Sequence, residues 1–399
     1  MQIGYNQICI NPIKPTNYVG FFTEKSPIIN VRGDLYARCL RLKDKQHNII
    51  IIAFDSLGIT SDIQAIFIAE IKKTINEDVE FIFSCTHTHY APSSCNMLGL
   101  INVDKPYLEY IISKVALMVK NCHMTEKPLT VNYSWESFNK VGRTRINNKS
   151  DENIYAGVLS FFDDNSRIGN ILFYNCHPTT PQDTPNYFSS AYPGSAVETL
   201  TKRYPSEFFI FLQGADGDVS TRLTRKSNKY EEVTRLGNEM ANAFNGLMNR
   251  NMNNGKKKLT LKFQNIELEI YNQLKDISLF DENKCINMTN KEKAVLLTGL
   301  NFVDSMKNKY KPHYSKVTFS CLTLASYHLI FNPFELFTDY NNYIDKNKSL
   351  LVCYSQGING YLTQPDNQHL SYEYYIELQT ENDKTNVVNI IKKLDEQSL

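Results

Sequence analysis

Two histidines separated by one residue end an apolar stretch near the start of the chain. Residues Phe81–Cys85 lead into Thr86, His87, Thr88 and His89. Side chains alternate along a strand, so we expect His87 and His89 to leave the same face a few ångströms apart. Such a pair suits zinc, because one imidazole can bind the ion while the other acts on a substrate. The alternative is that both rings cap the strand and hydrogen-bond to loop carbonyls.

Two further apolar stretches also end in polar residues. The stretch 168–175 runs into His177, and the proline that follows should end a strand there, because proline cannot donate to a sheet. The stretch 208–212 runs into a glycine-containing acidic turn that includes Asp218 and Ser220. Ligands of open α/β sheets bind at the carboxyl ends of the strands. The three strand ends therefore predict one functional site.

Short motifs spread over nearly the whole chain add a family resemblance. They are GYNQICINP (4–12), DLYAR (34–38), THTHYAP (86–92), NCHP (175–178), SAYPG (190–194), QGADGDVS (213–220), NPFELF (332–337) and GINGYLT (357–363). In this order they resemble the motifs of the neutral/alkaline non-lysosomal ceramidases, which are zinc amidases that cleave N-acyl bonds. The resemblance implies the catalytic domain of that family.

Matched residue by residue, the resemblance implies that His87, His177, Glu335 and Tyr361 are the zinc ligands. Two imidazoles, a carboxylate and a phenol oxygen leave room for a water molecule, as a catalytic site requires. Glu335 lies among apolar neighbours, where an unpaired carboxylate is costly and a cation would remove the cost. The alternative for Glu335 is a charge at the N-terminus of a helix that follows the preceding proline. The chain has 24 tyrosines, so Tyr361 is chosen from its motif alone.

The same resemblance implies the catalytic residues. His89 is similar to the histidine that contacts the scissile group beside the metal. Arg143 or Arg145 is similar to the arginine that holds substrate oxygens, and the sequence does not distinguish between them. Tyr372 is similar to the tyrosine that stabilises the oxyanion.

Asp218 and Ser220 are interpreted as organisers of the loop at the metal site. Ser220 as a nucleophile is the alternative, but a serine needs a base and a residue that orients the base, and neither is adjacent in sequence. Two departures from the family motifs lie nearby. Tyr90, Ala91 and Pro92 replace the usual Ser-Gly-Pro, and Thr221-Arg222 replaces Pro-Asn. We therefore expect substrate contacts near both loops to differ.

Composition bears on the partners and the compartment. The 43 basic and 42 acidic residues give a net charge of +1, so no electrostatic signal for nucleic acid or anionic membrane is present. Nine cysteines without a CxxC pair are interpreted as core residues in a reducing compartment. One of them, Cys85, shares the predicted strand face with His87 and is the alternative metal ligand. No apolar signal segment follows Met1, so a cytoplasmic enzyme and a soluble small-molecule N-acyl substrate are expected.

Hydrophobic periodicity predicts an α/β fold of mixed β-sheets flanked by helices. The predicted strands are 48–54, 79–85, 155–162, 167–174, 257–271, 317–324 and 350–354. The predicted helices are 61–76, 105–122, 193–203, 228–248, 291–309 and 382–395. The candidate ligands run from residue 87 to residue 361 and must converge. One large catalytic domain over 1–399, without the C-terminal immunoglobulin-like domain of secreted ceramidases, is therefore expected.

The combined expectation is a zinc-dependent hydrolase that cleaves an amide bond with a metal-activated water. Two alternatives remain open. One is another metal-dependent hydrolase acting on an ester, a lactone or a phosphoester, although the chain contains no HxHxDH motif. The other is a non-catalytic binding protein on the same fold.

Overall fold

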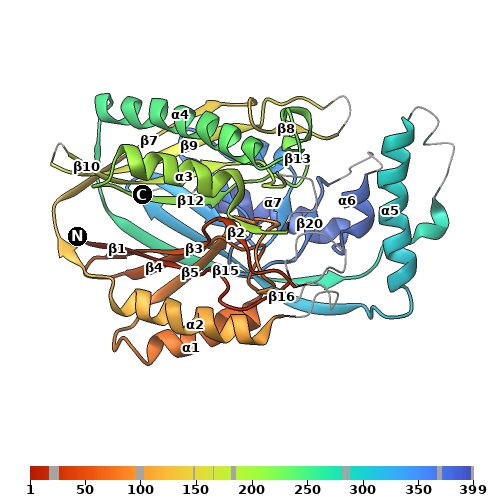
Figure 1. Ribbon diagram of the computed structural model, residues 1–399, viewed down its shortest axis with the longest axis horizontal. Coiled ribbons are helices and arrows are strands. Elements are labelled where there is room, and N and C mark those ends of the chain that lie inside the picture. The colour runs from red at the N-terminus through yellow and green to blue at the C-terminus, as the bar shows by residue number, and fades with distance from the viewer. Residues whose placement is uncertain are drawn as a thin grey trace.

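Three β-sheets form the centre of the structure, and helices cover them on opposite sides (Figure 1). The computed structural model describes residues 1–17, 27–95, 103–146, 149–164, 166–180, 186–280, 285, 288–365 and 371–396. Within these residues the chain forms one domain of mixed sheets flanked by helices, as predicted. None of the described helices combines the length and the apolar character needed to cross a bilayer.

The first sheet has the order β5-β4-β3-β1-β6. Its strands are Gln2–Cys9 (β1), Tyr36–Lys43 (β3), Asn48–Phe54 (β4), Glu80–Cys85 (β5) and Thr125–Glu126 (β6). The parallel pair β4 and β5 is connected through α1 (Ser61–Lys72), and α2 (Lys105–Lys120) lies beside α1 (Figure 1). The isoleucine-rich β4 is buried on both faces, because alternate residues face the helices and the other two sheets.

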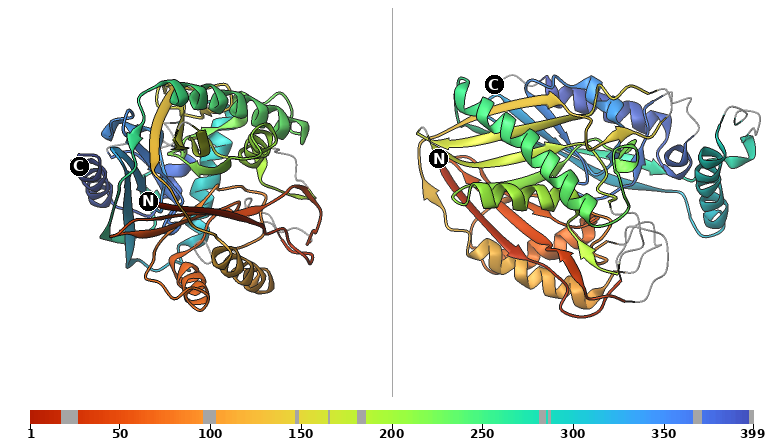
Figure 2. Two further views of the ribbon diagram at one scale, coloured as in Figure 1. Left: turned by 90° about the vertical axis from the view of Figure 1, so that its left-hand side faces the viewer. Right: turned by 45° about the horizontal axis from the view of Figure 1, so that its top comes forward.

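The second sheet has the order β12-β10-β9-β7-β14. Its strands are Leu129–Ser137 (β7), Tyr155–Asp163 (β9), Ser166–Tyr174 (β10), Phe208–Gln213 (β12) and Lys257–Lys258 (β14). The parallel strands β10 and β12 are connected through α3 (Ala191–Arg203). The long helix α4 (Glu231–Asn253) packs on α3 and covers the same side of this sheet (Figure 2).

The third sheet has the order β15-β16-β17-β19. Its strands are Leu261–Asn272 (β15), His313–Leu324 (β16), Tyr327–Phe331 (β17) and Ser349–Val352 (β19). Helix α5 (Asn290–Met306) is inserted between β15 and β16 and lies at one end of the molecule (Figures 1 and 2). It packs on the short helix α6 (Tyr372–Ile376), and α7 (Glu381–Asp395) packs against β15 and β17.

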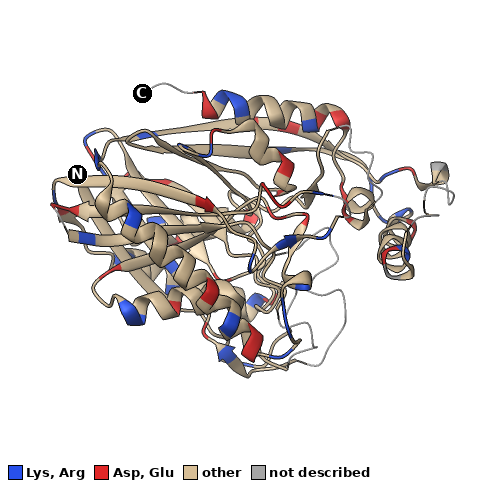
Figure 3. Ribbon diagram, turned by 90° about the horizontal axis from the view of Figure 1, so that it is seen from above, with Lys and Arg blue, Asp and Glu red and all other residues tan. Residues whose placement is uncertain are grey.

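One buried cluster joins the three sheets. It contains Ile51 from the first sheet, Ile171 from the second and Leu329 from the third, all with at most 1% exposure. Burial of such a side chain contributes about 1.5–3 kcal/mol. Acidic and basic residues are interspersed on the outer helices, in keeping with the net charge of +1 (Figure 3).

Three two-stranded ladders lie at the ends of the large sheets. They pair Val31–Gly33 (β2) with Phe188–Ser189 (β11), Arg143–Thr144 (β8) with Val219–Ser220 (β13), and Glu335–Leu336 (β18) with Tyr361–Leu362 (β20). The last ladder rules out the alternative for Glu335, because Glu335 starts a strand and no helix follows Pro333 directly. The backbone N–H of Glu335 donates to Gly360 O at 2.9 Å, so residue 335 is held in extended backbone by the neighbouring segment.

One correction concerns the histidine pair. Strand β5 ends at Cys85, and His87 has a φ of 60°. His87 and His89 therefore approach each other through a loop with a left-handed residue, and strand alternation does not place them. A left-handed conformation costs a non-glycine residue roughly 1–2 kcal/mol, so its neighbours must hold His87 in place.

The turn after β12 packs tightly on the ladder that contains Glu335. Gly217 N donates to Leu336 O at 2.8 Å, and a Cβ at residue 217 would lie 2.5 Å from the backbone oxygen of Glu335. A backbone oxygen in a ladder cannot move away as the end of a flexible side chain can. Only glycine therefore fits at this contact.

We predict that Gly217→Ala lowers the free energy of unfolding by about 1–3 kcal/mol, as overpacking does. The matched control is Gly246→Ala on α4, where a Cβ meets nothing within 4 Å. The control should be neutral or raise stability by up to about 1 kcal/mol, because alanine favours helix interiors. Chemical denaturation measures both variants, and an equal effect of the two would contradict the packing argument.

Candidate functional site

Three histidine rings meet at the ends of β5 and β10. One ligating nitrogen from each of His87, His89 and His177 lies within 4.8 Å of the others. The ring centroids are 4.9 Å apart for His87 and His89, 5.0 Å for His87 and His177, and 5.8 Å for His89 and His177. The structure thus brings the three predicted histidines together, and such a group could hold a metal ion.

Two of these rings are oriented by backbone carbonyls. The Nδ1 of His87 lies 2.7 Å from Leu57 O, and the Nδ1 of His177 lies 2.7 Å from Asp216 O. A carbonyl oxygen only accepts hydrogen bonds, so both Nδ1 atoms carry the proton. In the neutral rings each Nε2 then presents a lone pair. This is how metal-binding histidines are usually oriented.

Glu335 lies between these two Nε2 atoms. Its Oε2 is 3.2 Å from Nε2 of His177 and 3.6 Å from Nε2 of His87, and the residue is only 3% exposed. A carboxylate oxygen that faces two nitrogen lone pairs in a buried place is repulsive unless a positive charge lies among them. Two imidazoles and a carboxylate are ligands that zinc accepts. The side chains present therefore fit a zinc ion.

The protein environment shifts the pKa values of His87 and His177 in opposite directions. Burial holds the pKa of His87 well below its usual value, and the neighbouring histidines lower it further. Burial also disfavours the charged form of His177, but the Asp216 carboxylate and the hydrogen bond to Glu335 outweigh it and raise the pKa. Of the two rings, His177 therefore takes up a proton more readily than His87 when no metal ion is bound.

Tyr361 reaches the centre from the strand beside Glu335. The parallel register of β18 and β20 pairs Glu335 with Tyr361, and Tyr361 Oη lies 3.4 Å from His177 Nε2. Arg145 Nη2 donates to Tyr361 Oη at 3.2 Å. The ring of Tyr372, at the start of α6, meets the ring of Tyr361 edge-on with centroids 6.3 Å apart. The four predicted ligands and Tyr372 thus form one contiguous group.

The two candidate arginines occupy different environments. The side chain of Arg143 is 52% exposed, and its Nε donates to Asp151 at 2.6 Å. The side chain of Arg145 is 14% exposed and forms an ion pair with Glu373 at 2.8 Å. Only Arg145 is joined to the tyrosine and histidine group.

Asp218 and Ser220 support the surrounding loops. The buried Asp218 accepts hydrogen bonds from Thr338 N at 2.7 Å and Thr338 Oγ1 at 2.9 Å, and it pairs with Lys149 at 2.5 Å. Ser220 forms a backbone bridge with His177, and its hydroxyl accepts from Arg222 N at 3.4 Å. None of the described hydrogen bonds joins the Ser220 hydroxyl to a histidine ring, so the nucleophile alternative gains no base.

Two residues that sequence reasoning missed lie behind the histidines. Tyr354 stacks on His87 with ring centroids 3.8 Å apart and donates a hydrogen bond to Asp216. Burial raises the pKa of Asp216 to about 6, although His177 and Tyr354 act to lower it. The acidic turn already contained Asp216 as a signal, whereas Tyr354 carried none. Cys85, the alternative ligand, belongs to the hydrophobic core and not to the histidine group.

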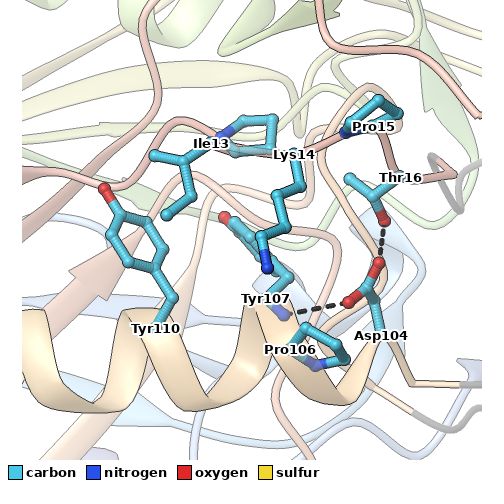
Figure 4. Close-up of a pocket in the computed structure, with 9 residues that line it drawn as sticks. Ile13, Lys14, Pro15, Thr16, Asp104, Pro106, Tyr107 and Tyr110 are labelled. Carbon is cyan, nitrogen blue, oxygen red and sulfur yellow. Dashed lines mark hydrogen bonds between the residues drawn. The ribbon is translucent and has the colours of Figure 1, made fainter.

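A surface pocket near the N-terminus of α2 lies apart from this group (Figure 4). Its lining includes Ile13, Tyr107 and Tyr110 but none of the candidate site residues. Asp104 accepts a hydrogen bond from Thr16 and caps α2 by accepting from Tyr107 N at 2.9 Å. The carboxylate in this pocket is therefore already used by the fold.

Comparison with known proteins shows which solved structures have a similar fold. No protein-family model matches the sequence, and no curated protein matches it either. Among solved structures, a ceramidase complexed with C2 aligns with a TM-score of 0.75 at 13% identity, over 99% of this chain and 74% of that chain. The neutral ceramidase from Pseudomonas aeruginosa aligns with a TM-score of 0.75 at 14% identity over the same shares. The expectation from the sequence motifs is confirmed at the level of the fold: the chain has the fold of these neutral ceramidase structures.

Proposed function

We propose that the chain is a zinc-dependent amidase that hydrolyses N-acyl amines. The observation that carries the proposal is the placement of the Glu335 carboxylate against the Nε2 atoms of His87 and His177. That arrangement needs a positive charge, and its ligand types suit zinc. The ceramidase fold supports amide hydrolysis as the reaction.

His87, His177, Glu335 and Tyr361 would hold the ion. When bound there, zinc would supply a Lewis acid that activates water near neutral pH and polarises a carbonyl oxygen. The backbone carbonyls of Leu57 and Asp216 keep the two imidazoles in the tautomer that binding requires. Asp216 also lies 3.4 Å from His177 Nδ1, where its charge makes this ring a stronger donor of electron density.

The remaining side chains would act on the substrate. Burial raises the pKa of Tyr372, and the adjacent Glu373 carboxylate raises it further, so the phenol stays protonated and can donate to an oxyanion. His89 lies beside the two ligand histidines and would be the second donor. Each such donor typically contributes about 3 kcal/mol to transition-state stabilisation. Arg145 would hold a substrate oxygen near Tyr361.

The first prediction separates metal binding from catalysis. Wild-type protein should contain about one zinc per chain, and His87→Ala and His177→Ala should lose it, because each removes one of few ligands. His89→Ala should keep the metal but lose roughly 100-fold in kcat, as expected for a lost oxyanion donor. The control is His313→Ala, at the exposed start of β16, which should change neither quantity.

Elemental analysis measures the zinc content. Activity is measured as hydrolysis of a panel of N-acyl amines, and esters, lactones and phosphoesters are assayed in the same way. Loss of zinc from His89→Ala would show that His89 is a ligand. Full activity in metal-free His87→Ala and His177→Ala would refute the zinc proposal.

The second prediction concerns the arginines. Arg145→Lys should lower kcat/KM by roughly tenfold or more, because the shorter lysine ammonium does not reach the place where Nη2 of Arg145 contacts both Tyr361 and Glu373. Arg143→Lys is the matched control. An exposed ion pair of this kind contributes only about 0–1 kcal/mol, so the control should stay near wild type. Steady-state kinetics of both variants decide, and a larger loss in Arg143→Lys would reverse the assignment.

A further inference from the structure

Glu373 is a buried carboxylate that the proposed reaction does not use. It lies at the start of α6 and is 4% exposed. Its Oε1 is 2.8 Å from Arg145 Nη2, and the two side chains are 6% and 14% exposed. A buried guanidinium without a partner would be costly. Glu373 therefore compensates the charge of Arg145 inside the protein.

This carboxylate is close to the proposed reaction centre. The Nη2 atom that binds Glu373 also donates to Tyr361 Oη at 3.2 Å, and that oxygen is 3.4 Å from His177 Nε2. Arg145 Nη2 further donates to Gly217 O at 2.5 Å. The negative charge of Glu373 is thus separated from the centre by one guanidinium and one phenol, a distance at which charges interact in a protein interior.

A second arginine, Arg222, lies on the same edge of the site as Arg145. Arg222 lies in the short turn of 3₁₀ helix Thr221–Leu223, which follows β13 and contacts β8, the strand that leads to Arg145. Burial and then the charge of Arg145 lower the pKa of Arg222, and Glu373 acts in the opposite direction. Among the described residues, the turn after β13 thus places a second arginine on the edge of the site where Arg145 pairs with Glu373.

We propose that Glu373 determines the charge class of the substrate, so that the site favours N-acyl amines without an anionic group on the amine portion. The proposal rests on the proposed amidase function. With Glu373 bound to its guanidinium, Arg145 is suited to donate to a neutral hydroxyl or carbonyl oxygen. A substrate carboxylate at the same place would meet the Glu373 charge and compete with it for Arg145. Removal of Glu373 would take away the ion-pair partner of Arg145, and the added positive charge on this edge would attract anions.

The test uses N-octanoylethanolamine and N-octanoylglycine, which differ by a hydroxymethyl group against a carboxylate. Wild type should show the higher kcat/KM for the neutral probe. Glu373→Gln should shift the ratio of the two kcat/KM values by roughly tenfold or more toward the anionic probe. Arg222→Gln should shift the ratio in the opposite direction, which a merely structural role would not do.

The conservative variant Glu373→Asp keeps the charge and should keep the preference for the neutral probe. Glu269→Gln on β15 and Arg203→Gln on α3 are exposed controls of the same chemistry, and both should leave the ratio unchanged. An unchanged ratio in Glu373→Gln would overturn the proposal. If that variant does not fold, Arg222→Gln decides, and no shift there would also overturn it.

The failure of the proposed function is distinguishable from the failure of this inference. If wild type hydrolyses neither probe, the amidase proposal fails. Calorimetric titration of the same probes then measures the ratio of Kd values in the wild type and the Gln variants. The same opposite shifts in Kd would support the inference, and unchanged Kd ratios or no binding of either probe would overturn it.

Discussion

The structure around the candidate site depends on one electrostatic constraint, the burial of the Glu335 carboxylate against two imidazole nitrogens that carry lone pairs. Oε2 lies 3.2 Å and 3.6 Å from these nitrogens, where water cannot solvate the charge. Such an arrangement is unfavourable unless a cation is present. The carbonyls of Leu57 and Asp216 turn both Nε2 atoms inward, so a bound metal ion or a proton on His177 must supply the positive charge.

The fold brings the ends of all three sheets together, and the side chains of the candidate site come from the segments that follow them. His87 follows the first sheet, His177 follows a strand of the second, and Glu335 follows the third after Phe331. The cluster of apolar residues shared by the sheets fixes their relative positions. Behind the histidines, Asp216 and Tyr354 hold the rings, and the Asp218 carboxylate ties the loop after β18 to the acidic turn. The strain at His87 is thus supported by stacking and hydrogen bonding.

Much of this fold could be predicted from the sequence, because most elements have strong apolar periodicity. The strand 48–54 was predicted with the bounds that the structure has, and the helices α1, α2, α5 and α7 within a few residues.

The ladder of Glu335 and Tyr361 was missed because its two strands are short and pair across 26 residues of chain. Strand alternation was the wrong reason for the proximity of His87 and His89, since a left-handed loop residue gives it. Arg143 and Arg145 are alike in sequence, and only their burial and partners distinguish them. Glu373 and Tyr354 act through contacts that no local pattern shows.

The most direct test of the account is anomalous X-ray diffraction at the zinc absorption edge from crystals of zinc-loaded protein. The account predicts a single strong peak at about 2.0–2.2 Å from the Nε2 atoms of His87 and His177 and from a carboxylate oxygen of Glu335. A peak at another place, or a refined structure in which a protonated His177 contacts Glu335 and no metal is bound, would contradict it.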